Sequence, residues 1–361
     1  MHRDCWLKHD HSKKDQGPEV RDQGSKVMWT SGSTFTEKDY DSSTPTGKRY
    51  HVIITASVSI YQQWQSRIFY YWYKKLREAN PEGDMGGFTR VLHAKKDDLL
   101  SREMHTVRVD PLDRDGGYVV LSRPFALNNF IEGGHLDAIE EEYILMAEPD
   151  HIFLRPLANF VDAGHHGIAF PFFYISPGAE ANVPLVERVL GRAVPRSELD
   201  EIDGTGNSPV IIAKGDFKRL SRLWHDYTLR IFEDTEMKKA WGWVLEMYGY
   251  TLAAHETGVR HIMYKKFMCQ PPWDTDDLGY AILHYTYGVD TDLEGTRILN
   301  GTLGEWRFDK RGYYHKSPER NLEPPPEGAP PLIKTLIAMI NEASANTPTW
   351  GTHDDPIREK G

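Results

Sequence analysis

The amino-acid sequence predicts an α/β fold built on a sheet that is parallel in large part. Short runs of β-branched and apolar residues alternate with longer segments of helical periodicity, an alternation typical of parallel strands joined by crossover helices. The 361 residues include 39% hydrophobic and 12% aromatic side chains, which is enough apolar surface to bury a substantial core. A mostly disordered chain is therefore excluded.

The first strand and the first helix are the most clearly marked elements. The run HVIITASVS, which begins at His51, has the β-branched content of a buried strand. A polar turn leads into a helix over 61–80, where apolar residues recur every four positions and so share one face, namely Trp64, Ile68, Trp72 and Leu76. We therefore expect this helix to pack one apolar stripe against the core.

Further strands and helices alternate along the rest of the chain. Each predicted strand is a short apolar run bounded by turn residues, glycine or proline. The predicted strands cover residues 86–94, 142–156, 167–175, 206–214 and 280–288. Two helices are predicted within 224–257, and the proline-rich bridge NLEPPPEGAPP leads to a final amphipathic helix over 331–344.

Composition predicts the domain organisation. Residues 1–48 are mostly Lys, Asp, Ser, Gly, Thr and Gln without apolar periodicity, so we expect an N-terminal tail or stem. The fold is predicted to occupy residues 49–351, including the proline-rich bridge and the final helix. Residues 352–361 are predicted to form a C-terminal tail.

Composition also limits the class of partner. The 43 Lys and Arg residues against 53 Asp and Glu give a net charge of −10, which argues against nucleic-acid binding. The two cysteines, Cys5 and Cys269, provide no disulfide framework. No window approaches the ~18 apolar residues of a membrane span, and residues 1–30 lack the apolar core of a signal peptide, so we expect a membrane anchor to be absent from this chain. A sequon at Asn300 would permit N-glycosylation in the secretory pathway.

An acidic motif interrupts the predicted strand over 142–156. Glu148, Pro149, Asp150 and His151 stand between two apolar runs. Side chains alternate in an extended segment, so we expect Glu148 and Asp150 on one face and His151 on the other. An acidic pair where an apolar strand ends matches the ligand site at the carboxyl edge of open α/β sheets. A solvated surface loop is the alternative interpretation.

Two later segments carry groups that complement these carboxylates. His284 follows a buried strand, and its neutral imidazole could join Asp150 in a mixed nitrogen and oxygen site for Mn²⁺ or a similar divalent ion. A core histidine bonded to a backbone carbonyl is the alternative. Arg307, Lys310 and Arg311 lie within six residues, a spacing that favours a diphosphate clamp, with a solvated basic turn as the alternative.

Glu246 is the most informative carboxylate on the predicted helices. It shares a face with Trp243 and Tyr250 on a helix that is apolar nearly all round. A carboxylate in such surroundings is costly unless it is paired or used. Two interpretations stay open, namely a contact with the substrate and a structural pair with an arginine.

The order of the motifs resembles that of one known family. Between Tyr50 and Gly351 the chain contains, in sequence, YYWYKK, DMGGFTR, GYVVLSRP, YILMAEPDH, AFPFFYI, GNSPVI, GWVLEMYGY, QPPWD, HYTYG, GEWRFDKR and PTWG. In this set the chain resembles the plant and green-algal peptidyl hydroxyproline O-arabinosyltransferases, to which the peptidyl serine α-galactosyltransferases are related. The resemblance implies a GT-A-type glycosyltransferase fold, with a mixed, mostly parallel sheet flanked by helices.

The resemblance also implies an activity. We expect a retaining glycosyltransferase that uses Mn²⁺ to move L-arabinofuranose from UDP-β-L-arabinofuranose to the hydroxyl of peptidyl 4-hydroxyproline. The expected acceptors are hydroxyproline-rich peptides and cell-wall glycoproteins such as extensins, in the lumen of the Golgi or the endoplasmic reticulum. A peptidyl serine α-galactosyltransferase that uses UDP-galactose is one alternative. A non-catalytic protein that binds hydroxyproline-rich peptides is another.

Roles for individual residues follow from the resemblance. Glu148 to His151 occupy the place of the DxD motif, and Asp150 is the expected metal ligand and catalytic residue, although this triplet begins with Glu. His284 stands where glycogenin-like enzymes supply a metal-binding histidine. Thr55 and Ala56 are expected to contact uridine and ribose. Lys310 and Arg311 are expected to contact the diphosphate. Asn207 and the catalytic Glu246 are expected to contact the sugar or the acceptor.

The implied mechanism needs no base from the protein. Metal and cations neutralise charge on the departing UDP, the acceptor hydroxyl approaches the same face of the sugar, and the leaving phosphate takes up the proton. Glu246 would position the sugar or stabilise its positive charge. A covalent intermediate on a carboxylate is the alternative.

An extended proline-rich acceptor would suit an aromatic groove, because a polyproline helix is already ordered and stacks on rings. The candidates for such a groove are Tyr70, Tyr71, Trp72, Phe172, Phe173 and Tyr174, and the alternative for most of them is a place in the core.

Overall fold

A seven-stranded sheet is the largest element of the computed structural model, which describes residues 40, 42–112, 118–271, 273–299 and 302–353. Most of the predicted N-terminal and C-terminal tails lie outside the described residues, as do Cys5 and the sequon residue Asn300.

Six of the seven strands run in the same direction. In spatial order they are β3 (Thr106–Val109), β2 (Met85–His93), β1 (Tyr50–Ala56), β4 (Tyr143–Ala147), β7 (Val210–Ala213), β6 (Gly167–Ala169) and β8 (His261–Met263). β7 is antiparallel to both of its neighbours. The predicted mixed, mostly parallel sheet is therefore confirmed, and β4 lies at its middle.

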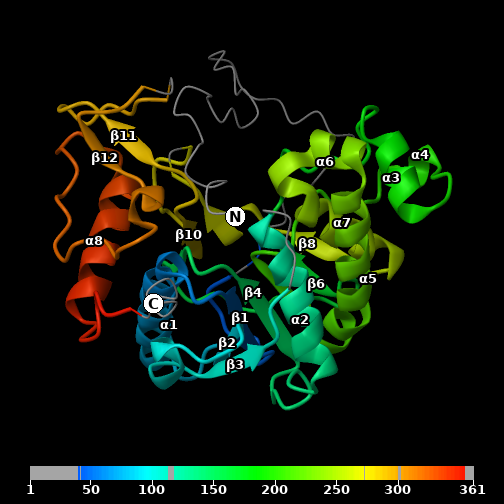
Figure 1. Ribbon diagram of the computed structural model, residues 1–361, viewed down its shortest axis with the longest axis horizontal. Helices are drawn as coiled ribbons and strands as arrows, with labels where there is room; N and C mark the ends of the chain where they lie inside the picture. Colours follow the sequence, from blue (N-terminus) through cyan, green and yellow to red (C-terminus); the bar gives the residue numbers. More distant parts are fainter. Residues whose placement is uncertain (1–39, 41, 113–117, 272, 300–301, 354–361) are drawn as a thin grey trace, which may run out of the picture. The chain divides into compact units, whose positions relative to one another are not determined.

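Helices connect and flank the strands (Figure 1). They are α1 (Ile60–Ala79), α2 (Ser122–Glu132), α3 (Val183–Leu190), α4 (Arg196–Leu199), α5 (Lys214–Glu233), α6 (Thr235–Trp241), α7 (Leu245–Glu256) and α8 (Pro331–Ala345). The predicted first and last helices are confirmed as α1 and α8. The helical prediction over 224–257 is confirmed in type, but the segment holds the end of α5, α6 and α7 instead of two helices, and α5 begins earlier, directly after β7. α2, α3 and α4 were not predicted. Among the described helices, none combines the length and the hydropathy that a membrane crossing requires.

α1 contributes to two hydrophobic cores. Ser59 caps its N-terminus by accepting a hydrogen bond from the backbone N–H three residues further on, at 3.3 Å. Phe69 packs into the core around the central sheet, whereas Trp64, Ile68 and Trp72 pack into a second core. The predicted stripe of α1 is thus confirmed as a buried face at its first three residues, and its fourth, Leu76, is half-buried.

The second core joins the C-terminal part of the chain to α1. α8 lies beside α1 (Figure 1), where Trp72 Nε1 donates to the Met339 carbonyl at 3.1 Å and the Tyr71 hydroxyl donates to Glu342 at 2.6 Å. The strands of this part are β5 (His151–Phe153), β9 (Met268–Cys269) and β10 (Ile282–His284), in the order β5-β10-β9, and the hairpin of β11 (Val289–Thr291) and β12 (Trp306–Phe308). Because β5 follows β4, its pairing with β10 brings C-terminal residues next to the acidic motif.

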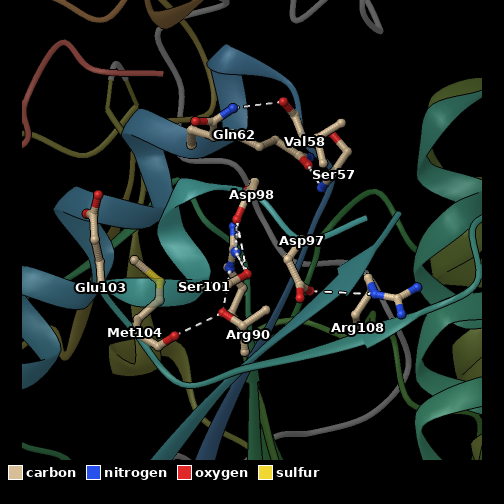
Figure 2. Close-up of polar contacts among 12 residues, drawn as sticks. Ser57, Val58, Gln62, Arg90, Asp97, Asp98, Ser101, Glu103, Met104 and Arg108 are labelled. Atoms are coloured by element: carbon tan, nitrogen blue, oxygen red, sulfur yellow. Dashed lines mark hydrogen bonds and ion pairs between the residues drawn. The ribbon is translucent and has the colours of Figure 1, made fainter. Parts of the chain in front are cut away.

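A buried ion pair fixes the loop that follows β2 (Figure 2). The Arg90 side chain is fully buried, and its guanidinium donates to both carboxylate oxygens of Asp98, at 2.8 Å for the Nη1 contact. Arg90 Nε also donates to Thr106 Oγ1 on β3 at 3.2 Å. In the same view Arg108 pairs with Asp97 at 3.5 Å, but both of these side chains are exposed. Because the first pair is buried, loss of one partner would leave an uncompensated charge, whereas solvent screens the second pair.

Replacing Arg90 with methionine should leave Asp98 as an uncompensated buried charge. We expect the free energy of unfolding to fall by about 3–5 kcal/mol. Arg108→Met removes the same chemical group from the exposed pair and should cost less than about 1 kcal/mol. Urea unfolding followed by circular dichroism measures both variants. Equal losses would contradict burial as the cause.

Candidate active site

The acidic motif after β4 forms a tight turn. The His151 N–H donates to the Glu148 carbonyl oxygen at 3.0 Å, which closes a four-residue turn. Pro149 occupies its second position, where proline is favoured because its φ is already set. The predicted extended geometry is therefore wrong for this motif. Asp150 and His151 join one cluster of side chains, and Glu148 joins another.

Asp150 is the centre of the first cluster. Its Oδ2 atom lies 3.2 Å from His284 Nε2 and also accepts a hydrogen bond from Lys310 Nζ. All three residues are buried. Burial raises the pKa of Asp150, but Lys310 and His284 outweigh this effect and hold that pKa well below its ordinary range. The structure thus brings together Asp150, His284 and Lys310, as the predicted metal and diphosphate site requires.

Strand pairing places His284 in this cluster. β10 is antiparallel to β5, and His284 is the register partner of His151. The Tyr285 N–H donates to the Asp150 carbonyl at 3.3 Å, which ties the end of β10 to the turn. His284 Nε2 contacts the Asp150 carboxylate, whereas the alternative interpretation required a backbone carbonyl.

His151 is a member of the cluster that the sequence analysis did not assign. Its ring centroid lies 4.5 Å from that of His284. In the part of the chain that the structure describes, His151 Nε2 and His284 Nδ1 are buried without hydrogen-bond partners. Ligand atoms of Asp150, His151 and His284 lie within 4.8 Å of one another. Burial, together with the nearby His284, holds the pKa of His151 well below its ordinary value, so its imidazole is neutral, as metal ligation requires.

A second cluster lies on the other side of the turn and is centred on Arg123, near the start of α2. Arg123 Nη2 lies 2.9 Å from Glu148 Oε2, and Nη1 lies 3.3 Å from Glu246 Oε2. The Asn207 amide, with its NH₂ toward the carboxylate, donates to both oxygens of Glu246 at 3.1 and 3.2 Å. Glu148, Asn207 and Glu246 are thus joined through an arginine that the sequence analysis missed. A buried carboxylate such as Glu246 needs a cation as its partner. This requirement is the signal in the sequence that could have pointed to Arg123.

Glu246 is held inside this second cluster and is buried. Its backbone N–H donates to the Tyr118 hydroxyl at 3.4 Å. Burial raises the pKa of Glu246 to about 7, although Arg123 opposes the shift. The arginine partner that one interpretation required is present, and a substrate contact stays a prediction.

Thr55 and Ala56 end β1 next to β4, and both are buried. The segment after them is fixed by Gln62, whose side chain accepts a hydrogen bond from the Ser57 N–H (Figure 2). Thr55 and Ala56 thus lie at the carboxyl edge of the sheet, as the prediction of a nucleotide contact requires.

Arg311 lies beside Lys310 but makes a different ion pair. Its Nη2 atom lies 2.8 Å from Asp309 Oδ2, and its guanidinium lies 6.0 Å from the centre of the Tyr287 ring. The structure therefore joins Lys310, and not Arg311, directly to Asp150.

Comparison with known proteins identifies the family. Residues 50–263 match the hydroxyproline O-arabinosyltransferase family N-terminal domain, and residues 281–351 match the C-terminal domain of that family. The chain is 49% identical over 307 residues to hydroxyproline O-arabinosyltransferase RDN2 of Medicago truncatula, covering 84% of this chain and 82% of that protein. It is 42% identical over 348 residues to hydroxyproline O-arabinosyltransferase 2 of Arabidopsis thaliana, covering 95% and 94%.

One more distant relative in sequence is also a glycosyltransferase by name. The chain is 22% identical over 285 residues to the peptidyl serine alpha-galactosyltransferase of Arabidopsis thaliana, covering 73% of this chain and 32% of that protein. Among solved structures, the galactosyltransferase LgtC with donor and acceptor sugar analogs matches at 13% identity with a TM-score of 0.36, over 65% of this chain and 87% of that one. At that score the structural likeness carries no argument.

The family models and the relatives together define a glycosyltransferase. Within that class, the chain belongs to the hydroxyproline O-arabinosyltransferase family, so the family prediction made from the motifs is confirmed.

The buried Glu246 predicts a pH dependence of stability. Its pKa is about 7 in the folded chain against an ordinary value of 4.5. Below about pH 4.5 Glu246 is protonated in both the folded and the unfolded chain, and the stability that it supports is fully present. This stability is lost as the pH rises through about 7, because the buried carboxyl then becomes charged. Glu246→Gln cannot titrate, so between these pH values the variant should gain up to about 3 kcal/mol relative to the wild type.

Urea unfolding at about pH 5 and about pH 8 measures this change. The control is Glu236→Gln, an exposed glutamate that should show no such trend. A difference between Glu246→Gln and wild type that is the same at both pH values would contradict the raised pKa.

Proposed function

We propose that this chain transfers L-arabinofuranose from UDP-β-L-arabinofuranose to the hydroxyl of peptidyl 4-hydroxyproline, with retention of configuration, on a GT-A-type domain. The observation that carries the proposal is the buried cluster of Asp150, His284 and Lys310, assembled from distant segments at the carboxyl edge of the sheet. Open α/β sheets bind their ligands at this edge. Family membership and the names of the relatives support the donor sugar and the acceptor residue.

The residues of this cluster fit a divalent metal ion. Asp150, His151 and His284 would hold it, because within the described residues each histidine has a buried ring nitrogen without a hydrogen-bond partner. Two imidazoles and a carboxylate suit a borderline divalent ion, and we propose Mn²⁺. When bound, such an ion neutralises negative charge on a departing diphosphate.

The cations of the chain complete the proposed donor site. Lys310 supplies a fixed positive charge at Asp150, so little reorganisation is needed when charge develops on the leaving group. Arg311 offers a guanidinium on the same short helix, η5 (Lys310–Tyr313), which suits a phosphate contact. Thr55 and Ala56 are proposed to contact uridine and ribose.

The second cluster is proposed to orient the donor sugar. Arg123 and Asn207 hold the Glu246 carboxylate from two sides, so its position is fixed before the substrate arrives. Glu148 acts through Arg123 and is not assigned to the metal.

In the proposed reaction the hydroxyproline oxygen bonds to the anomeric carbon on the face from which UDP departs. The bond from that carbon to the phosphate oxygen breaks, and the acceptor proton passes to the leaving phosphate. We further propose cell-wall glycoproteins as acceptors and the Golgi or endoplasmic reticulum lumen as the compartment, both on the family resemblance.

A second candidate is transfer of galactose from UDP-galactose to peptidyl serine. The similarity to the Arabidopsis thaliana peptidyl serine alpha-galactosyltransferase supports it, at lower identity than the similarity to the arabinosyltransferases.

Mass spectrometry of a hydroxyproline-rich peptide tests the proposal. The peptide is incubated with the protein, Mn²⁺ and either UDP-arabinofuranose or UDP-galactose. We expect a pentose on hydroxyproline, formed at least about 100-fold more slowly by Asp150→Asn. The control is Asp97→Asn, an exposed carboxylate that should leave the rate unchanged.

Other products would select other functions. A hexose on serine would establish the galactosyltransferase, and no product with either donor would favour a protein that binds the peptide without modifying it. Full activity of Asp150→Asn would contradict the assignment of the cluster.

A further inference from the structure

Four aromatic side chains lie on segments next to the candidate active site, three of them exposed and one, Tyr174, half-buried. Phe173, Tyr174, Tyr287 and Trp273 form a set that we call the aromatic row. Phe173 is 58% exposed, Trp273 41% and Tyr287 40%, whereas most other large aromatic side chains of the described chain are buried or half-buried. Aromatic rings gathered on a surface next to a site are typical of a binding surface.

Ring contacts join the four residues in two pairs. The centroids of Phe173 and Tyr174 lie 5.1 Å apart, and so do those of Tyr287 and Trp273. The second pair lies near the Asp150 cluster, because the Tyr287 ring lies 6.0 Å from the guanidinium of Arg311. Arg311 is the chain neighbour of Lys310, which donates to Asp150.

Strand directions explain why the row meets the site. Phe173 and Tyr174 follow β6, which is parallel to β4 because both are antiparallel to β7. Trp273 follows β9 and Tyr287 follows β10, and these two strands are parallel. Since β10 ends at His284, within the Asp150 cluster, the segments that carry the row leave their strands on the side of the acidic motif.

We propose that the aromatic row binds the hydroxyproline-rich acceptor peptide in the polyproline II conformation. This inference rests on the proposed function and names the residues that would select its acceptor. A polyproline II helix has three residues per turn and no internal hydrogen bonds, and it is ordered before binding. It therefore presents pyrrolidine rings to aromatic side chains at a low cost in conformational entropy. Because both pairs of rings follow strands that end on the side of the acidic motif, a peptide bound across them has its hydroxyl groups beside the donor site.

This row differs from the groove that the sequence suggested. Trp72 is buried in the second core, and Phe172 is buried in the core of the central sheet. Tyr71 bonds to Glu342 on α8, and the Tyr70 ring packs against Phe88 at 5.0 Å. Of the six predicted residues, Phe173 and Tyr174 belong to the row.

Peptide binding in the absence of donor tests the row. The probe is a fluorescently labelled hydroxyproline-rich peptide, and its anisotropy is measured with the full chain. Phe173→Ala and Trp273→Ala should each raise the peptide Kd by about 5- to 30-fold. Phe173→Tyr and Trp273→Phe keep a ring and should stay within about 3-fold of the wild type. Neither residue belongs to the two charged clusters, so the Kd for UDP, measured by calorimetry, should not change.

The outcomes separate this inference from the proposed function, because no sugar transfer is needed. A glycine- and serine-rich peptide of equal length should bind at least about 10-fold more weakly, since it has no preformed polyproline helix. The inference is overturned by an unchanged peptide Kd in both alanine variants, by equal losses in the ring-retaining variants, or by the absence of peptide binding to the wild type. Failure of the mass-spectrometric assay alone would instead count against the proposed reaction.

Discussion

The buried negative charge of Asp150 is the constraint on which the rest of this site depends. A carboxylate removed from water needs partners. Those of Asp150 are His284, which lies 134 positions further along the chain, and Lys310, which lies 160 positions further along. The second core makes this possible, because α8 and the short strands around β10 pack against α1 and hold the C-terminal segments at the end of β4. The packing of apolar side chains thus determines where the charged groups meet.

One turn supplies both clusters. Glu148 and Asp150 are two residues apart, yet their carboxylates bind different cations, Arg123 for the first and Lys310 for the second. The segment matching the N-terminal family domain carries Asp150, Arg123 and Glu246, and the segment matching the C-terminal domain carries His284 and Lys310. Neither segment alone contains the complete site. The division of the family into two sequence domains therefore does not correspond to a division of the chemistry.

Much of the fold could be predicted because its elements have strong local patterns. The four-residue spacing of Trp64, Ile68 and Trp72 defines α1, and the β-branched run from His51 defines β1. The reversed direction of β7 could not be predicted, because pairing direction depends on contacts between segments distant in sequence. The short hairpin of β11 and β12 was missed for the same reason.

At the site, residue types were easier to predict than geometry. Asp150, His284 and Lys310 were singled out from their own segments, and the fold brings them together. His151 was missed because alternation in an extended strand would direct it away from Asp150, whereas Pro149 sets a turn that brings both into one cluster. Arg123 was missed because nothing near it in the sequence indicates that Glu148 and Glu246 lie on either side of it.

The most direct test of the Asp150 cluster is calorimetric titration of UDP into the protein, with Mn²⁺ and with a chelator. If Asp150, His151 and His284 hold a metal that meets the diphosphate, Mn²⁺ should tighten UDP binding by at least about 10-fold, and UDP should tighten Mn²⁺ binding by the same factor. Asp150→Asn should abolish this coupling, and Asp97→Asn should keep it. Equal UDP affinity with and without Mn²⁺, or intact coupling in Asp150→Asn, would contradict the assignment of this cluster as the metal and diphosphate site.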